Sequence, residues 1–265
     1  MFREMTDSFE TRARAEANWR SLYRLAGMGA ALSLALVLLD MALSFTGGDV
    51  GVSEMSVQEW FSLYQRNWFM GLRNLGLFNV VSTLVTIPLY LALYRLHRRT
   101  CPAYAALALA LFLVGTAIYA SNNRALAMLT LSSQYAAAQA GVGREVLAVA
   151  GAVVLAQAED FTPGTFTGFL LTSAGSLGMM AAMLSGQVFG KRTALAGLAG
   201  TACLLVFTVS VTFAPAAMSL MMVLALAGGL LMLGWNAAMA RAMFRLGRFG
   251  AGAPAGARPA AGYPG

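Results

Sequence analysis

Long apolar runs alternate with short polar connections along most of the chain. An α-helix rises about 1.5 Å per residue, so about 20 apolar residues cross a hydrocarbon core of about 30 Å. The pattern therefore predicts an all-α, polytopic membrane protein with six transmembrane helices. These spans are expected at about residues 25–45, 75–94, 102–120, 163–189, 193–213 and 215–240.

Prolines mark several of the predicted span boundaries. Pro102, Pro163 and Pro215 suit the first turn of a helix, where a missing amide hydrogen costs nothing. Pro88 lies inside the second span instead, where it removes a backbone hydrogen bond. We expect a kink there.

The connection between the first two spans contains a predicted short helix at residues 57–72. Ser56 and Glu59 have the spacing of a capping box, which satisfies free amide groups at a helix start. Four-residue spacing would place three aromatic side chains on one face of this helix: Trp60, Tyr64 and Trp68. Such a face is typical of the bilayer interface or of packing on the bundle, and a ligand cage is the alternative.

The longest interruption, residues 121–160, separates the third and fourth spans. Its apolar part, Val146–Ala158, has 13 residues and reaches about 20 Å as a helix, too short to cross a bilayer. We expect short helices over residues 124–158 that cap the outer face, with Val146–Ala158 as a lateral or re-entrant helix. A seventh span is the rival topology, and it would move the arginine-rich C-terminus to the outside.

Composition and charge agree with a membrane protein and predict its orientation. Only 11% of the residues are charged, against about 25% in soluble proteins. Of the 18 lysines and arginines, 14 lie in the termini and in the loops after the second and fourth spans. The positive-inside rule then places both termini in the cytoplasm, with residues 1–24 as an amphipathic segment and residues 247–265 as a disordered tail. The net charge of +7 therefore favours a lipid bilayer as partner, not nucleic acid.

No reaction motif occurs in the sequence. The chain has one histidine, His97, in a basic loop, and it lacks clustered metal ligands, nucleophile–base pairs and nucleotide-binding loops. We therefore expect no enzyme activity, no cofactor and no metal, and a solvated His97. Cys101 and Cys203 fall in or beside apolar helices, so a disulfide framework is not expected.

A polar cluster is predicted in the outer half of the bundle. Asp40 is the only carboxylate inside a span, where an ionisable group is costly and indicates either a functional site or a structural ion pair. Its expected partners are Arg73 and Arg124. The predicted ligand pocket contains Asp40, Arg73, Asn74, Asn79, Asn123, Arg124, Gln134 and Tyr135, beside the aromatic face.

Small residues recur at four-residue spacing in the fourth span, at Gly164, Gly168, Thr172 and Ser176. This spacing lets two helices approach closely. Packing within the bundle is the favoured interpretation, and a homodimer through these residues is the alternative.

One stretch of the chain also resembles a known family. Residues 129–138, LTLSSQYAAA, precede an alanine- and leucine-rich helix and a glycine-rich span, and they follow a span with an internal Ile87-Pro88 and a basic loop. This order resembles a bacterial six-span membrane family catalogued as domain of unknown function 4386, over roughly spans two to five. The resemblance implies a multi-pass protein of the bacterial cytoplasmic (inner) membrane with an outer LSxQY helix, and it implies no established reaction.

These patterns lead to two hypotheses about function. The first is binding or transport of a small molecule from an outward-facing polar pocket. The second is a non-catalytic membrane sensor or accessory partner of another membrane or cytoplasmic protein.

Overall fold

The structure is a computed structural model that describes residues 2–44, 55–158, 162–186 and 188–249, with side chains from Glu16 onward. Within these ranges every regular element is a helix, so the all-α prediction is confirmed. The prediction of six spans is also confirmed, because six stretches of the described chain are long and apolar enough to cross a membrane. They are Glu16–Leu43, Leu77–His97, Pro102–Ala137, Pro163–Gly186, Lys191–Phe213 and Pro215–Phe249.

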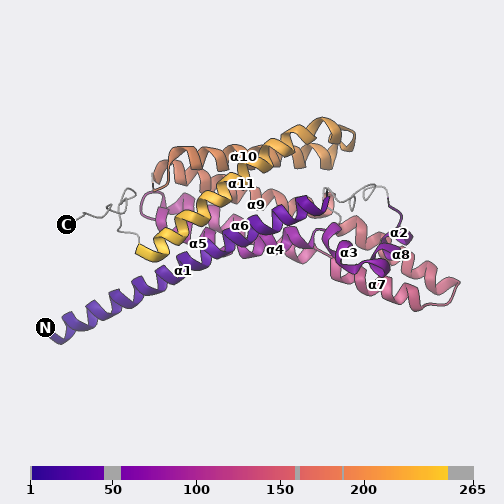
Figure 1. Cartoon of the computed structure of the whole chain (residues 1–265), viewed down its shortest axis with the longest axis horizontal. Helices are drawn as coiled ribbons and strands as arrows, with labels where there is room; N and C mark the ends of the chain where they lie inside the picture. Colours follow the sequence, from indigo (N-terminus) through magenta and orange to yellow (C-terminus); the bar gives the residue numbers. More distant parts are fainter. Residues whose placement is uncertain (1, 45–54, 159–161, 187, 250–265) are drawn as a thin grey trace, which may run out of the picture.

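The spans run side by side along the long axis of the molecule, with the start of α1 and the end of α11 at the same end (Figure 1). Neighbouring spans form a closed ring. Helix α1 packs on α4, α5 and α11. From α11 the ring continues through α10, α9 and α6, and α6 packs on α4 and α5. The helices are α1 (Phe2–Leu43), α4 (Leu77–Val85), α5 (Ile87–His97), α6 (Pro102–Asn122), α9 (Pro163–Gly186), α10 (Lys191–Phe213) and α11 (Met218–Phe249).

The helices α1 and α11 extend beyond two of the predicted segment boundaries. The polar residues 2–24 are not a separate segment, since α1 is one continuous helix of 42 residues. Residues 247–249 belong to α11 and not to a tail. The remaining part of the predicted disordered tail, residues 250–265, lies outside the described residues.

The second span is broken where the sequence predicts a kink. Helix α4 ends at Val85, and α5 begins at Ile87 with Pro88 in its first turn. Pro88 has no amide hydrogen to donate to the preceding turn, so the backbone hydrogen bonds of α4 cannot continue into α5. Thr86 sits in the break, and its hydroxyl donates to the Thr83 carbonyl at 2.7 Å.

A densely packed core fills the half of the bundle that carries the basic loops, which we name the basic end. Tyr90 stacks on Phe112 with ring centroids 3.5 Å apart, and its hydroxyl donates to Ser176 at 2.6 Å. Helix α9 approaches α6 closely because its contact face is small, and a Cβ on Gly168 would lie 2.7 Å from the backbone nitrogen of Tyr119. The face that holds Gly164, Gly168, Thr172 and Ser176 is thus used within the chain. A homodimer through the same residues stays a prediction that would have to share this face.

Four shorter helices form the opposite end, which we name the cap end. They are α2 (Val57–Arg66), α3 (Trp68–Asn74), α7 (Ala125–Ala137) and α8 (Val142–Ala158). Helix α7 follows α6 after a break at Asn123 and Arg124, and α8 returns beside α7 to reach α9. This hairpin extends beyond the bundle along the long axis (Figure 1), whereas the sequence suggested a lateral or re-entrant helix.

The predicted helix at residues 57–72 is two helices. Its capping box is confirmed, since the Ser56 amide donates to Glu59 Oε2 at 2.6 Å and the Glu59 amide donates to Ser56 Oγ at 3.3 Å. Asn67 then ends α2 and caps α3, with its Oδ1 accepting from the Met70 amide at 3.2 Å. An asparagine that hydrogen-bonds nearby backbone amides competes with helix continuation.

Candidate functional site

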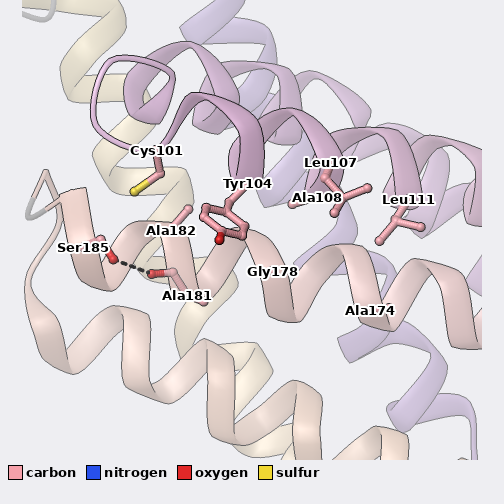
Figure 2. Close-up of a pocket in the computed structure, with 10 residues that line it drawn as sticks. All are labelled: Cys101, Tyr104, Leu107, Ala108, Leu111, Ala174, Gly178, Ala181, Ala182 and Ser185. Carbon is pink, nitrogen blue, oxygen red and sulfur yellow. Dashed lines mark hydrogen bonds between the residues drawn. The ribbon is translucent and has the colours of Figure 1, made fainter.

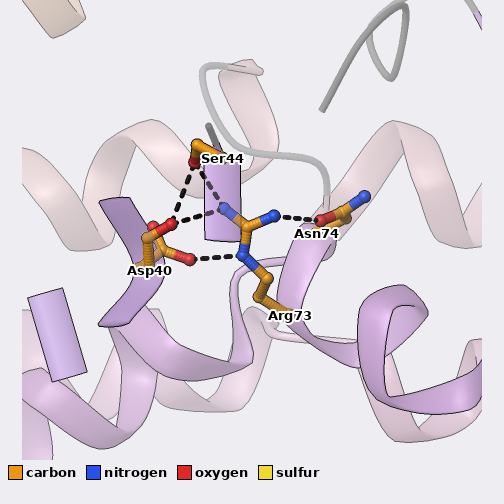
Figure 3. A network of polar contacts seen from close by, with 4 residues as sticks. All are labelled: Asp40, Ser44, Arg73 and Asn74. Atoms are coloured by element: carbon orange, nitrogen blue, oxygen red, sulfur yellow. Dashed lines mark hydrogen bonds and ion pairs between the residues drawn. The ribbon is translucent and has the colours of Figure 1, made fainter. Parts of the chain in front are cut away.

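The predicted ion pair between Asp40 and Arg73 is confirmed, and it joins the end of α1 to α3 (Figure 3). Arg73 Nε donates to Asp40 Oδ1 at 2.7 Å, and Nη2 donates to the Asp40 carbonyl at 2.8 Å. Nη1 donates to Asn74 Oδ1 at 3.0 Å, and Nη2 also reaches Ser44 Oγ. The guanidinium therefore uses all three nitrogens on atoms of the protein.

The Arg73 side chain is 3% exposed and that of Asp40 is 34% exposed. A ligand could reach only the carboxylate, since the guanidinium is enclosed by its partners. A buried arginine needs such compensation, because removing its counter-ion would leave a charge in a low-dielectric site. The geometry favours a structural clamp over a binding site.

Of the other predicted pocket residues, Asn74 belongs to this clamp, whereas Asn123, Arg124 and Gln134 have other surroundings. Arg73, and not Arg124, is the partner of Asp40, and Arg124 is exposed at the start of α7. Asn123 donates to the Leu75 carbonyl at 2.8 Å and so fixes the α6–α7 break. Gln134 is exposed. The single pocket expected from these residues is wrong in its composition.

Tyr135 has a packing role at the cap end. Its ring lies 4.8 Å from that of Phe61, and the Arg144 guanidinium lies 5.2 Å from the Tyr135 centroid. It belongs to the rim of a second apolar cluster that holds α2, α3, α7 and α8 together. Its contacts are those of a core residue.

The predicted aromatic face is also divided. Trp60 and Tyr64 are buried in the cap-end cluster, and the Tyr64 hydroxyl donates to the Ala125 carbonyl at 3.0 Å. Burial raises the pKa of Tyr64 above its ordinary value. Trp68 lies in the next helix, is 58% exposed, and meets Phe69 edge-on. The break at Asn67 causes this separation, so the three side chains form no cage.

A cavity of about 260 Å³ lies among α4, α6, α9 and α10, in the halves of these spans toward the cap end. Of the predicted pocket residues only Asn79 lines it. Most other lining side chains are hydroxyl-bearing or aromatic, and none is charged. The lining consists of Asn79, Ser82, Thr83, Tyr119, Thr165, Phe169, Thr172, Leu204, Phe207 and Thr208.

Three lining threonines donate their hydroxyl hydrogens to their own helices. Thr83 donates to the Asn79 carbonyl and Thr172 to the Gly168 carbonyl, both at 2.8 Å. Thr165 donates to the Thr162 carbonyl at 3.2 Å. A hydroxyl has one donor and two acceptor lone pairs, so the oxygens of Thr83 and Thr172 retain acceptor sites after the donor is used. The cavity thus offers hydrogen-bond acceptors in an uncharged setting.

Sequence reasoning missed this cavity, although a signal was present. Thr165, Phe169 and Thr172 follow a three- and four-residue spacing on one face of the fourth span. Thr208 in α10 is buried on the opposite wall, and its hydroxyl forms no hydrogen bond within the described chain. The sequence of one span cannot show this cavity, because the convergence of these side chains depends on the arrangement of four helices.

A second hollow of about 240 Å³ lies between α6 and α9 at the basic end, and we name it the basic-end groove (Figure 2). Its walls are apolar apart from Cys101, Tyr104 and Ser185, and the Ser185 hydroxyl already donates to Ala181 at 3.4 Å. The remaining lining residues are Leu107, Ala108, Leu111, Ala174, Gly178, Ala181 and Ala182.

His97 is a correction to the sequence analysis, because it is fully buried and not solvated. Its Nδ1 lies 2.8 Å from the Leu93 carbonyl, and its ring lies 6.0 Å from that of Phe189. This contact holds the loop after α5 against the segment after α9. Among the described residues no group of three or more histidines, cysteines or acids could hold a metal ion.

No family model, curated protein or solved structure matches the chain. The resemblance to the family catalogued as domain of unknown function 4386 therefore stays a prediction.

Proposed function

We propose that the protein binds a small, uncharged molecule with a hydrogen-bond donor in the cavity among α4, α6, α9 and α10. The observation that supports this most is the lining, which combines hydroxyl acceptors with aromatic and aliphatic walls and has no charged side chain. Ligand pockets are commonly apolar with a few placed polar groups that fix orientation. A charged ligand would lose its hydration here without gaining a counter-ion.

The size of the cavity limits the ligand. Pockets for drug-sized molecules measure roughly 300–1,000 Å³, and this cavity measures about 260 Å³. A single aromatic or alicyclic ring with one hydroxyl or N–H group would suit it. The donor group would bond the lone pairs of Thr172 or Thr208, whose oxygens otherwise stay poorly solvated inside the bundle.

The proposal includes orientation in the membrane. The termini and the loops after the second and fourth spans carry 14 of the 18 lysines and arginines, which supports a cytoplasmic location for both termini by the positive-inside rule. The cavity would then face the outer half of a bacterial inner membrane. This replaces the predicted pocket around Asp40 with a site deeper in the same half of the bundle.

Two matched probes and two matched variants test the binding proposal. Indole has one N–H donor, and 1-methylindole has none. We expect indole to raise the melting temperature of the detergent-purified protein saturably, and 1-methylindole to bind about three- to tenfold more weakly because one buried hydrogen bond is lost. Thr208→Phe fills the cavity and should abolish stabilisation by both probes. Val209→Phe, on the lipid-exposed side of the same helix, should keep it.

The same experiment separates the second candidate function. Helix α8 exposes four valines at helical spacing, Val142, Val146, Val149 and Val153, each more than half exposed. Such an uncovered apolar face is typical of a contact surface, and it favours an accessory or sensor protein that meets a partner through the hairpin. If neither probe stabilises the wild-type protein and Thr208→Phe changes nothing, binding in the cavity is contradicted and the accessory role is favoured.

A further inference from the structure

The basic-end groove has the length of one bilayer leaflet. It runs along α6 from Cys101 to Leu111 and along α9 from Ser185 to Ala174 (Figure 2). Ten residues of helix correspond to about 15 Å, which is half of a hydrocarbon core of about 30 Å. One wall of the groove is built from small side chains, and the other carries Tyr104 and Leu107, which are 75% and 57% exposed.

Two basic loops flank the mouth of this groove. Arg98 and Arg99 precede Cys101, and Lys191 and Arg192 follow the segment after Ser185. The loops lie side by side because His97 in one packs on Phe189 in the other, with ring centroids 6.0 Å apart. All four basic side chains are exposed.

The positive charge at this mouth is not neutralised within the described chain. None of the four basic side chains forms an ion pair there, since the described ion pairs join Arg20 to Glu16 and Arg73 to Asp40. Glu16 is the only described carboxylate side chain at the basic end, and it already pairs with Arg20 at 3.7 Å. Among the described side chains, no carboxylate thus competes with an external anion for these four basic groups.

We propose that the basic-end groove holds one acyl chain of an anionic phospholipid, whose phosphate lies between the two basic loops. The apolar walls match the chain, and the unpaired arginines and lysine match the headgroup. Basic pockets between spans recruit such headgroups because each positive side chain near the membrane surface attracts an anionic lipid. This site is separate from the cavity near the cap end, and it does not depend on the proposed binding there.

Lipid retention by the purified protein tests the proposal. The probes are phosphatidylglycerol and phosphatidylcholine with identical acyl chains, and inorganic phosphate as a headgroup without chains. We expect native mass spectrometry to show one retained phosphatidylglycerol, with much weaker phosphatidylcholine and no effect of phosphate. The double variant Arg99→Gln with Arg192→Gln should weaken the affinity for phosphatidylglycerol about 30-fold, since each basic residue near the membrane surface contributes about fivefold to that affinity.

The control with the same change in charge is Arg66→Gln with Arg124→Gln, which removes two exposed charges from the cap end. It should leave retention unchanged. Ala181→Phe fills the groove and should remove the lipid, whereas Ala199→Phe, exposed on α10, should not. Helix content and elution volume check that each variant is folded, and Ala181→Leu replaces the phenylalanine variant if that variant does not fold.

Three outcomes would overturn the proposal. Equal retention of phosphatidylcholine would contradict a binding site for the anionic headgroup. Stabilisation by phosphate alone would indicate that the two loops bind a free anion and not a lipid. Unchanged retention of phosphatidylglycerol by the folded groove-filling variant would contradict binding of an acyl chain in the groove.

Discussion

At the scale of single residues, the pair of Asp40 and Arg73 has the clearest energetic consequence. Asp40→Leu would leave a guanidinium that is 3% exposed without its counter-ion, at an expected cost of about 2–3 kcal/mol. Removing both charges with Asp40→Leu and Arg73→Leu should cost less than Asp40→Leu alone. Denaturant unfolding in detergent measures these differences.

The outcome that contradicts this interpretation is specific. If Asp40→Asn unfolds like the wild type but loses indole binding, Asp40 acts in ligand binding and the structural clamp is wrong. A double-mutant cycle with no coupling between the two positions would also contradict it.

The sequence predicted this pair and failed on its neighbours for physical reasons. Asp40 is isolated in an apolar span, so a buried charge had to find a basic partner near the same depth. Tyr135 has no such constraint, since an aromatic ring on a short helix can face a ligand or pack on Phe61 with equal ease. Four-residue spacing places Trp68 beside Trp60 and Tyr64 only in a continuous helix, and Asn67 interrupts that helix.

At the scale of elements, the capping box of α2 predicts a dependence on pH. The hydrogen bonds that the Ser56 amide and hydroxyl donate to its carboxylate lower the pKa of Glu59 below its ordinary value. A lowered pKa in the folded state means that the cap stabilises α2 fully above about pH 4.5, and that this contribution is lost as the pH falls through the folded value. We expect the amides at the start of α2 to exchange faster at pH 3 than the intrinsic pH dependence explains.

The matched variant for this prediction is Ser56→Ala, which removes the hydroxyl that bonds the Glu59 amide. Its first-turn amides should already be poorly protected at pH 6 and should show little further loss at pH 3. If the wild type keeps full protection of these amides at pH 3, the capping box does not control the start of α2.

The cavity illustrates what a single element cannot show. Thr172 and Thr208 lie in different spans, and each hydroxyl in isolation is an ordinary feature of a membrane helix that bonds its own backbone. Only the placement of α4 and α10 on opposite sides of α6 and α9 turns these side chains toward a shared space. Hydropathy predicts the six spans one by one, but the rotation of one helix relative to the next is decided by tertiary packing.

At the scale of the whole molecule, the ring of spans differs between its two ends. The basic end is filled by large buried side chains such as Trp235 and Met239, whereas the cap-end half contains the cavity. The break between α4 and α5 falls near the boundary of these halves, where Ser82 and Ser33 share a 2.6 Å hydrogen bond. The buried core at the basic end can hold the helices in position, with the basic-end groove outside it between α6 and α9, while the cap-end half retains space among four helices.

The topology gives the last prediction. The first turn of α1 and the last turn of α11 lie at one end of the bundle, and the α7–α8 hairpin lies at the other (Figure 1). If the basic end is cytoplasmic, as we propose from the positive-inside rule, a cysteine at Gln139, in the exposed turn of the hairpin, would face outward. A cysteine at Thr100, in the exposed loop before α6, would face inward.

In a background with Cys101→Ala and Cys203→Ala, a membrane-impermeant maleimide should label Gln139→Cys in intact cells and Thr100→Cys only after permeabilisation. The two residues are both exposed, so a difference in labelling reports the side of the membrane and not burial. The reverse labelling pattern would show the opposite membrane orientation, with the basic end outside. Labelling of both cysteines in intact cells would contradict the single crossing by α6 between residues 100 and 139. A lipid-soluble maleimide should label both positions in every condition, which shows that each thiol is reactive and that missing labelling by the impermeant reagent reports protection by the membrane.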